Sequence, residues 1–343
     1  MYIRITFLFL FCFSLAVNAQ ATIEQVVVTA TRTDTDRDSL AVAWSIVNQS
    51  EIDTANAIHV NEIMQRVAGS WISRGNGQES LVSIRSPVLT GSGACGAYLA
   101  SWDGIPLRAT GFCNVNQLFD VNFEQASTIE VIKGPAPAAF GSDAMHGIIN
   151  FLSAAPSFVP DHEISVEHGS YGYSRAKYHY RNRSNSNGIS INTNISQDNG
   201  YQNDSGFDQQ KFTLRWEDYG QIWSTVLAAE VSNLEQETAG YIKGFGSYKD
   251  RTLRRENPNP EAFRDSWSAL AYGRFSRKIK KNHTLYITPY VRSTGMTFLQ
   301  HYLPWQPTEW NRHRSIGLKS SIRIAGTNSH WVVGFDGELT RGS

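Results

Sequence analysis

The sequence lacks several features that would place it in a familiar class of protein. Its formal net charge is 0, with 31 basic and 31 acidic side chains, so it has no basic excess of the kind that neutralises nucleic-acid phosphates. The zinc motif His-Glu-x-x-His, the Gly-x-Ser-x-Gly elbow and the phosphate-binding loop are missing. These absences disfavour a nucleic-acid partner, an enzyme, a metal site and a cofactor.

Long apolar runs are missing as well, except at the N-terminus. There Arg4 precedes the apolar run from Ile5 to Val17, and Val17-Asn18-Ala19 supplies small residues. This pattern predicts a secretory signal peptide over residues 1–19 that is cleaved after Ala19. The run is short for a spanning helix, which is the alternative. The exported chain is then either soluble or a membrane protein that spans with β-strands. Such strands contain no long apolar run, because apolar and polar residues alternate along them.

The chain divides near residues 156–160, where its pattern changes. Before that point, Val60 to Val67 predicts a short helix, and short β-prone runs at 81–84, 98–100 and 129–132 lie between glycine and proline turns. From Glu163 onward apolar residues alternate with polar ones, as in Ile189, Ile191, Thr193 and Ile195. The first part therefore predicts a small α+β domain, and the second predicts antiparallel strands.

The connections in the second part differ strongly in length. Tight turns at 218–221 and 280–282 contrast with the long stretch 238–264. Short turns on one side and long loops on the other are typical of an outer-membrane β-barrel. A secreted β-sandwich is the alternative that alternation alone leaves open.

Four segments of the first part resemble the plug of a TonB-dependent outer-membrane receptor. Their order and spacing match that family from about residue 23 to residue 152. Taken in chain order, the third segment is a weak signal by itself and the fourth is the most specific to the family. The four segments are the box-like Glu24-Gln25-Val26-Val27-Val28-Thr29-Ala30, the strand Leu81-Val82-Ser83-Ile84-Arg85, the turn Trp102-Asp103-Gly104-Ile105-Pro106-Leu107, and the signature Ile129-Glu130-Val131-Ile132-Lys133-Gly134 that runs on to Asn150.

The resemblance implies an organisation in four parts. A signal peptide at 1–19 is followed by a TonB box with a periplasmic segment at 20–40, a plug domain at 41–158 and a partial transmembrane β-barrel at 159–343. An extended valine-rich strand such as the TonB box can add to the edge of a partner's sheet. The fold class expected is a small α+β plug followed by an antiparallel transmembrane β-barrel that is incomplete in this chain.

The resemblance also implies a function. Such receptors sit in the cell outer membrane among its lipids, bind a small extracellular ligand and import it with energy delivered by TonB and its inner-membrane complex. We expect a scarce ligand such as a ferric siderophore or another metal chelate, with no chemical step. A vitamin, glycan or peptide receptor, and a soluble secreted β-rich binding protein, are the alternatives.

Individual residues take expected roles from the same resemblance. Arg108, Asn114 and Asn116 follow the Asp-Gly turn and are candidate polar ligand contacts. Arg85, Glu130 and Lys133 are candidates for a charge cluster that joins the plug to the barrel wall.

The barrel portion is shorter than the resemblance requires. Residues 163–343 contain eight or nine expected strands, whereas a barrel with a plugged lumen has about 22. We therefore expect a fragment or a truncated gene product, and an eight-strand barrel would have no room for the plug.

Cysteine is scarce, and this generates a prediction. Cys12 lies in the signal peptide, which leaves Cys95 and Cys113 in a chain bound for an oxidising compartment. We expect them to form a disulfide that ties two ligand-facing plug loops together and stabilises the fold by about 3 kcal/mol. A metal site is the alternative, but no second pair of ligands lies nearby. Reduction should change the electrophoretic mobility of the chain; unchanged mobility with both thiols open to alkylation would contradict the bridge.

Overall fold

The computed structural model describes residues 42–87, 98–112, 116–136, 140–326 and 329–343, together with the backbone of two short strands nearer the N-terminus. Those strands, β1 (Val27–Val28) and β2 (Thr35–Asp36), pair antiparallel. The remaining described residues form two bodies. We call residues 42–154 the inner domain and residues 161–342 the large sheet.

The inner domain is a small α+β unit. Five strands form one sheet in the order β3-β8-β9-β6-β7, and β4 pairs with β5 beside it. Among the described strands of this domain, the β6–β9 pair is parallel and the other pairs are antiparallel. In chain order the elements are β3 (Ala43–Asn48), α1 (Gln49–Ala55), α2 (Val60–Met64), β4 (Ser70–Arg74), β5 (Ser80–Ile84), β6 (Leu99–Trp102), β7 (Ile105–Pro106), η4 (Gln117–Asp120), η5 (Phe123–Gln125), β8 (Thr128–Lys133) and β9 (Gly147–Leu152).

Local sequence explains both helices. Helix α1 begins at a capping box in which Asn48 Oδ1 accepts from the Glu51 backbone N–H at 3.0 Å and Glu51 Oε2 accepts from the Asn48 N–H at 2.9 Å. It ends at Asn56, whose φ of 42° is a left-handed conformation that asparagine tolerates. Helix α2 ends earlier than the predicted residue 67, but the predicted apolar face is buried throughout: Val60, Ile63, Met64 and Val67.

The core of the inner domain continues onto the wall of the large sheet. Ile129, Ile149 and Phe151 are fully buried on β8 and β9. The same apolar cluster includes Tyr272 and Tyr290 from the large sheet. Burying one such side chain contributes about 1.5–3 kcal/mol, so this shared core holds the two bodies together as well as the inner domain itself.

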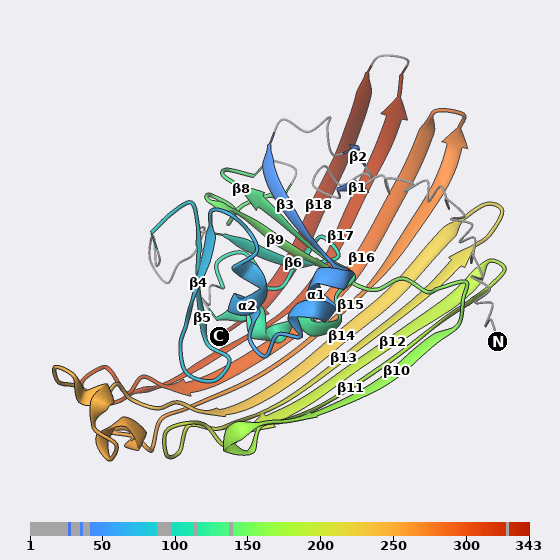
Figure 1. The fold of residues 1–343 in the computed structure, drawn as a ribbon. Helices are drawn as coiled ribbons and strands as arrows, with labels where there is room; N and C mark the ends of the chain where they lie inside the picture. Colours follow the sequence, from blue (N-terminus) through green and yellow to red (C-terminus); the bar gives the residue numbers. More distant parts are fainter. Residues whose placement is uncertain are drawn as a thin grey trace, which may run out of the picture.

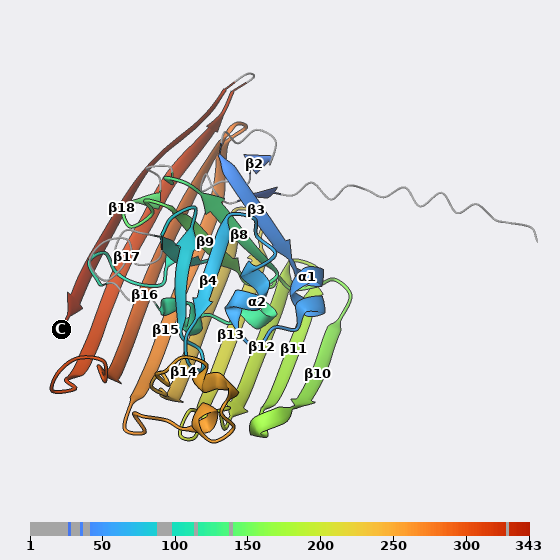
Figure 2. The same cartoon turned by 60° about the vertical axis from the view of Figure 1, so that its left-hand side comes forward.

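The large sheet contains nine antiparallel strands, each paired with the next in sequence. Figures 1 and 2 show it as a curved trough with the inner domain on its concave side. Within the described residues β10 and β18 are its edges, so the sheet is not closed. The strands are β10 (Asp161–His168), β11 (Ser174–Ser184), β12 (Asn187–Asp198), β13 (Phe207–Tyr219), β14 (Ser224–Glu237), β15 (Phe263–Lys280), β16 (His283–Leu299), β17 (Thr308–Ala325) and β18 (His330–Gly342).

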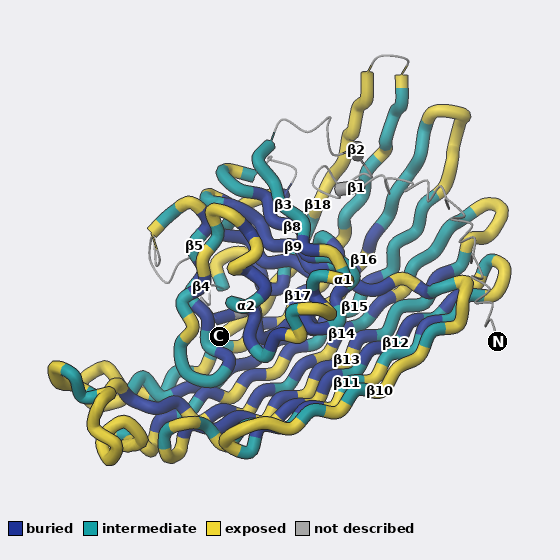
Figure 3. Tube along the Cα trace, viewed as in Figure 1, coloured by how far each residue is buried: buried dark blue, intermediate teal, exposed yellow. Residues whose placement is uncertain are grey.

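The two faces of the large sheet differ in chemistry, as the alternating sequence predicted. On β12, Ser190, Asn192 and Asn194 are buried, whereas Ile191 and Ile195 on the opposite face are more exposed. Figure 3 shows this alternation of buried and exposed positions along the strands. A polar concave face and an apolar outward face are the pattern of strands that contact lipid on one side.

The short connections between strands lie at one end of the sheet, and the longer connections lie at the other end. At one end, the turn end, strands are joined by residues 185–186, 220–223, 281–282 and 326–329. At the other, the loop end, the connections are residues 169–173, 199–206, 238–262 and 300–307. Short 3-10 helices lie among them: η7 (Ser170–Gly172), η8 (Ser247–Lys249) and η9 (Leu253–Arg255). Within the described residues, every helix is too short or too polar to cross a membrane.

The N-cap of α2 makes the inner domain sensitive to pH. His59 is fully buried, its Nε2 donates to Glu79 O at 2.9 Å, and its Nδ1 accepts from Asn61 N–H at 3.1 Å. Burial, and then the nearby Arg74 charge, lower the pKa of His59 to about 4. Between pH 6.5 and 4 the unfolded chain therefore binds a proton that the folded domain does not.

We predict that the inner domain is most stable above pH 6.5 and loses about 3 kcal/mol as the pH falls toward 4, because one pKa unit corresponds to about 1.4 kcal/mol. The measurement is the opening free energy from hydrogen exchange, corrected for intrinsic rates. His59→Gln should reduce the slope of the opening free energy against pH. His146→Gln controls for the loss of a histidine elsewhere in the domain. Equal slopes for His59→Gln and the unaltered chain would contradict this assignment.

Candidate functional site

The turn between β6 and β7 is one of the places where the inner domain contacts the large sheet. Ser101 pairs with Pro106 and Trp102 with Ile105, which leaves Asp103 and Gly104 as the two turn residues. Their φ angles are 49° and 79°. A two-residue turn with both φ angles positive favours asparagine, aspartate and glycine, so the Asp-Gly sequence fits this geometry.

The carboxylate of Asp103 is buried and fully engaged. Its Oδ1 accepts from the Ser153 backbone N–H at 2.9 Å, and its Oδ2 accepts from Ser153 Oγ at 2.6 Å and from the Tyr272 hydroxyl at 3.0 Å. Arg215 of β13 lies 3.9 Å away as an ion pair. One side chain thus joins the turn to the end of β9 and to two strands of the large sheet.

Four cationic side chains from four strands surround this turn. We call them the cationic cradle: Arg215 on β13, Arg274 on β15, Arg292 on β16 and Lys319 on β17. Arg274 donates to Asp103 O at 2.7 Å, Lys319 donates to Gly104 O at 2.7 Å, and Arg292 donates to Pro106 O. Charged donors form the stronger class of hydrogen bond, so the cradle fixes three backbone carbonyls of the hairpin.

A second buried contact lies beneath η5. Lys211 of β13 donates to both carboxylate oxygens of Glu124, at 2.8 and 3.0 Å, with side-chain exposures of 0% and 4%. Next to it the backbone N–H of Asn122 donates to Glu230 on β14 at 2.6 Å. Removing one member of such a pair would leave an uncompensated buried charge.

A third contact joins the 108–120 region to β15. Arg108 donates to Asp120 at 2.8 Å, and Asp120 accepts from Ser266 Oγ at 3.3 Å. Burial raises the pKa of the Asp120 carboxyl, while the charge of Arg108 opposes that shift.

Further polar contacts reach the loop end. Glu79 pairs with Arg264 at 2.8 Å, and the Gln78 N–H donates to Gln236 at 2.7 Å. Arg175 on β11 donates to Ala57 O at 2.6 Å. The inner domain is therefore held at several levels of the sheet, mostly by charged or polar groups.

A cavity of about 380 Å³ adjoins the turn. Its lining includes Asp103, Arg215, Arg274 and Lys319, so it borders the cationic cradle. The space lies between the hairpin and the concave wall, and the groups around it carry both signs of charge.

Two of the candidate ligand residues are described, and both are buried. Arg108 pairs with Asp120, and Asn116 accepts from the Ser80 backbone N–H at 2.8 Å. Their role as ligand contacts stays a prediction. Asn114, Cys95 and Cys113 lie outside the described residues.

The TonB-box residues Glu24, Gln25, Val26, Thr29 and Ala30 also lie outside the described residues. Val27 and Val28 are described as backbone only, in β1.

The charge cluster expected from Arg85, Glu130 and Lys133 takes a different form. Lys133 donates to Ser45 Oγ at 2.8 Å and to Ala68 O at 3.0 Å, and Glu130 accepts from Asn150 Nδ2 at 2.9 Å. These are contacts within the inner domain. Sequence reasoning missed the cradle, although its basic residues occupy the polar positions of the alternating strands.

Comparison with known proteins places this arrangement in context. A family model, the TonB-dependent Receptor Plug Domain, matches residues 36–148. Among solved structures, the ferric citrate transporter FecA in its unliganded form superposes with a TM-score of 0.72 at 15% identity, covering 88% of this chain and 48% of its own. The ferric yersiniabactin uptake receptor FyuA from Yersinia pestis gives 0.71 at 16%, covering 88% and 49%.

A third structure, the outer-membrane ferripyoverdine receptor of Pseudomonas aeruginosa bound to ferripyoverdine, gives a TM-score of 0.74 at 10% identity and covers 92% of this chain and 45% of its own. At these identities the likeness is one of fold. The chain spans about half the length of the solved structures it matches.

The contacts of Asp103 generate a prediction. Asp103→Asn keeps a side chain that tolerates the left-handed turn but removes the charge facing the cradle. We expect the opening free energy of the inner domain to fall by about 1–3 kcal/mol, because one acceptor oxygen becomes an amide NH₂ that faces the donors of Ser153 and Tyr272, whereas Arg215 keeps its ion pair with Glu217. Hydrogen exchange of the Asp103 amide, which donates to Phe151 O at 2.8 Å, reports this opening. The matched control is Asp143→Asn, also left-handed with φ 66° but more exposed; equal effects would exclude the charge as the cause.

Proposed function

We propose that this chain, which carries a TonB-dependent receptor plug domain at residues 36–148 followed by the strands of a receptor barrel wall, acts in the outer membrane as an active importer of a scarce ligand. The ligand class we propose is a ferric siderophore or another metal chelate. The observation that carries the proposal is an inner domain with its own sheet, held by buried ion pairs against the polar face of a large sheet whose other face is apolar.

The outward face of the large sheet supports the membrane location. Exposed apolar side chains recur on neighbouring strands, among them Leu227, Val231, Val291, Ile316 and Leu318. A soluble protein rarely exposes a continuous apolar band of this kind. This disfavours the alternative of a soluble secreted β-rich binding protein.

The contacts that hold the inner domain against the large sheet support active rather than passive transport. With the inner domain in place, the polar groups of the concave face are engaged by Asp103, Glu124 and Glu79. Opening a path requires those contacts to separate, and each buried pair resists separation strongly. An external source of work is therefore needed, which is the part we assign to TonB and its inner-membrane complex.

The N-terminal segment is where we propose that TonB engages. Residues Glu24 to Ala30 are valine-rich, and Val27–Val28 adopt strand backbone paired with Thr35–Asp36. A short strand of this kind can exchange its partner for the edge of another protein's sheet. Force applied there would pass along residues 30–42 directly to β3, which pairs with β8 in the inner sheet.

Ligand recognition is proposed for the loops around Cys95 and Cys113. A bridge between them would order both loops before binding and so reduce the entropy cost of capture. Asn114, with Arg108 and Asn116 nearby in sequence, would supply polar contacts. Relatives of the same fold include receptors described as taking ferric citrate and ferric yersiniabactin, which favours a metal chelate over a vitamin, glycan or peptide.

The test compares a strain lacking the gene with a strain in which the gene is restored, both grown under iron limitation. We expect uptake of one ferric chelate to be lost and recovered, and to depend on the proton gradient. Val28→Pro should abolish energised uptake but leave ligand binding intact, because proline removes a backbone N–H that a strand needs. Ser39→Pro, in the same segment outside the box, is the control. Normal uptake in the deletion strain would refute the chelate assignment.

A further inference from the structure

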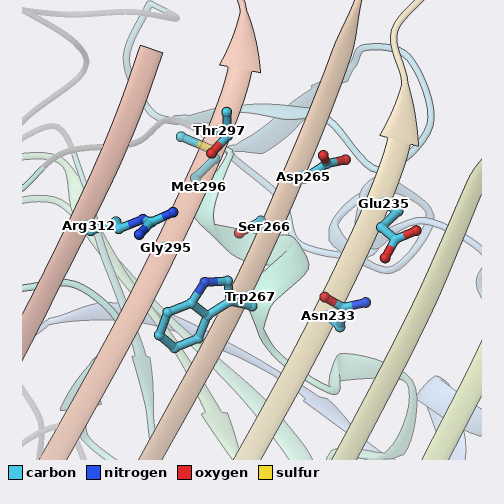
Figure 4. A pocket seen from close by; sticks show the side chains of 9 residues that line it. All are labelled: Asn233, Glu235, Asp265, Ser266, Trp267, Gly295, Met296, Thr297 and Arg312. Carbon is cyan, nitrogen blue, oxygen red and sulfur yellow. The ribbon is translucent and has the colours of Figure 1, made fainter. Parts of the chain in front are cut away.

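The outward face of the large sheet has a pocket near the loop end that the proposed transport route does not use. Figure 4 shows the pocket from outside. It has a volume of about 160 Å³, and its lining includes Asn233, Glu235, Asp265, Trp267, Thr297 and Arg312. A second space of about 480 Å³ adjoins it and shares Trp267 and Arg312. Together they form one shallow groove across β14 to β18.

A glycine shapes the floor of this groove. Trp267 and Gly295 are register partners on β15 and β16. A Cβ at Gly295 would come within 2.6 Å of the Trp267 indole nitrogen. The missing side chain therefore lets the indole lie across the neighbouring strand, with 40% of the residue still exposed.

Three arginines form the wall on the β17 and β18 side. Arg312 and Arg314 lie two residues apart on β17 and so share the outward face, and Arg341 on β18 is the register partner of Arg314. All three are exposed. In the described part of the chain, the structure records no ion pair between these guanidiniums and a carboxylate.

The opposite wall is acidic. Glu235 on β14 and Asp265 on β15 are register partners on the same outward face. Two carboxylates side by side repel an anion, so a phosphate group is excluded from this wall and directed to the arginines.

An apolar band begins immediately below the arginines, toward the turn end. The row next to Arg314 and Arg341 contains Val291, Ile316 and Leu339, which are 51%, 60% and 78% exposed. Trp267 lies where the polar and apolar bands meet, the depth at which tryptophan is enriched at membrane interfaces. The groove is therefore positioned for a molecule with an anionic head and an apolar tail.

We propose that this groove binds the phosphate-bearing headgroup of a membrane lipid from the leaflet at the loop end. Arg312, Arg314 and Arg341 hold the phosphate, since guanidinium forks match phosphate oxygens. Trp267 packs against the head–tail junction, and the acyl chains follow the apolar band. The inference rests on the proposed function, because it requires the outward face to lie in a bilayer.

The test uses native mass spectrometry of the full chain extracted in detergent and incubated with dioleoyl phosphatidic acid or dioleoyl phosphatidylcholine. We expect the chain to prefer the phosphatidic acid. Replacing all three arginines by glutamine should weaken that binding by about tenfold or more, because charge-assisted contacts are lost. Replacing them by lysine should restore part of it. Arg277→Gln on β15, an exposed outward position at the turn end, is the matched control and should leave the preference unchanged.

The outcomes separate this site from the membrane assignment itself. Membrane insertion of each variant is checked by heat-modifiable electrophoretic mobility. An inserted chain that binds both lipids equally, or whose glutamine variant keeps the preference, overturns the lipid site and leaves the proposed function standing. Displacement of the lipid by an equal concentration of inorganic phosphate overturns the lipid as occupant. A chain that never inserts overturns both proposals.

Discussion

The buried charge of Asp103 is the constraint on which the rest of the arrangement depends. A carboxylate removed from water must be matched by donors and cations, and the matching groups come from Ser153, which follows β9, and from β13 and β15. The groups on β13 and β15 lie on the concave face of the large sheet, so the turn must rest against that face for the carboxylate to be satisfied. The position of the β6–β7 hairpin against the polar concave face therefore follows from this requirement.

Buried polar and charged groups make much of the contact between the two bodies, beside the apolar cluster that reaches Tyr272 and Tyr290 of the large sheet. Ion pairs such as Lys211–Glu124 contribute little net stability relative to well-packed apolar residues. Removing one member of the pair is nevertheless strongly destabilising, because the other charge stays buried without its partner. Water that enters as the inner domain moves can solvate both partners together. Polar contacts of this kind therefore hold the inner domain at rest and can separate once water enters.

The sequence predicted the periodic features of the fold well, because they are encoded within a few residues. The alternation on β12 and the buried face of α2 were both correct, since each depends only on local spacing. Helix α1 was missed although Asn48 and Glu51 form its capping box, because seven residues carry too little periodicity. The cradle could not be foreseen. Arg215, Arg274, Arg292 and Lys319 resemble any polar residues of alternating strands, and only long-range register brings them to Asp103.

On strand β16, the packing of the inner domain and the shape of the outward groove depend on the same strand register. Gly295 faces outward beneath the Trp267 indole, while its neighbour Met296 is buried in the apolar cluster that contains Phe119 of the inner domain. Strand side chains alternate strictly, so a slip of one residue would exchange the two faces. It would place the glycine against the inner domain and the methionine under the tryptophan. The packing that seats the inner domain thus also fixes the register on which the outward groove is built.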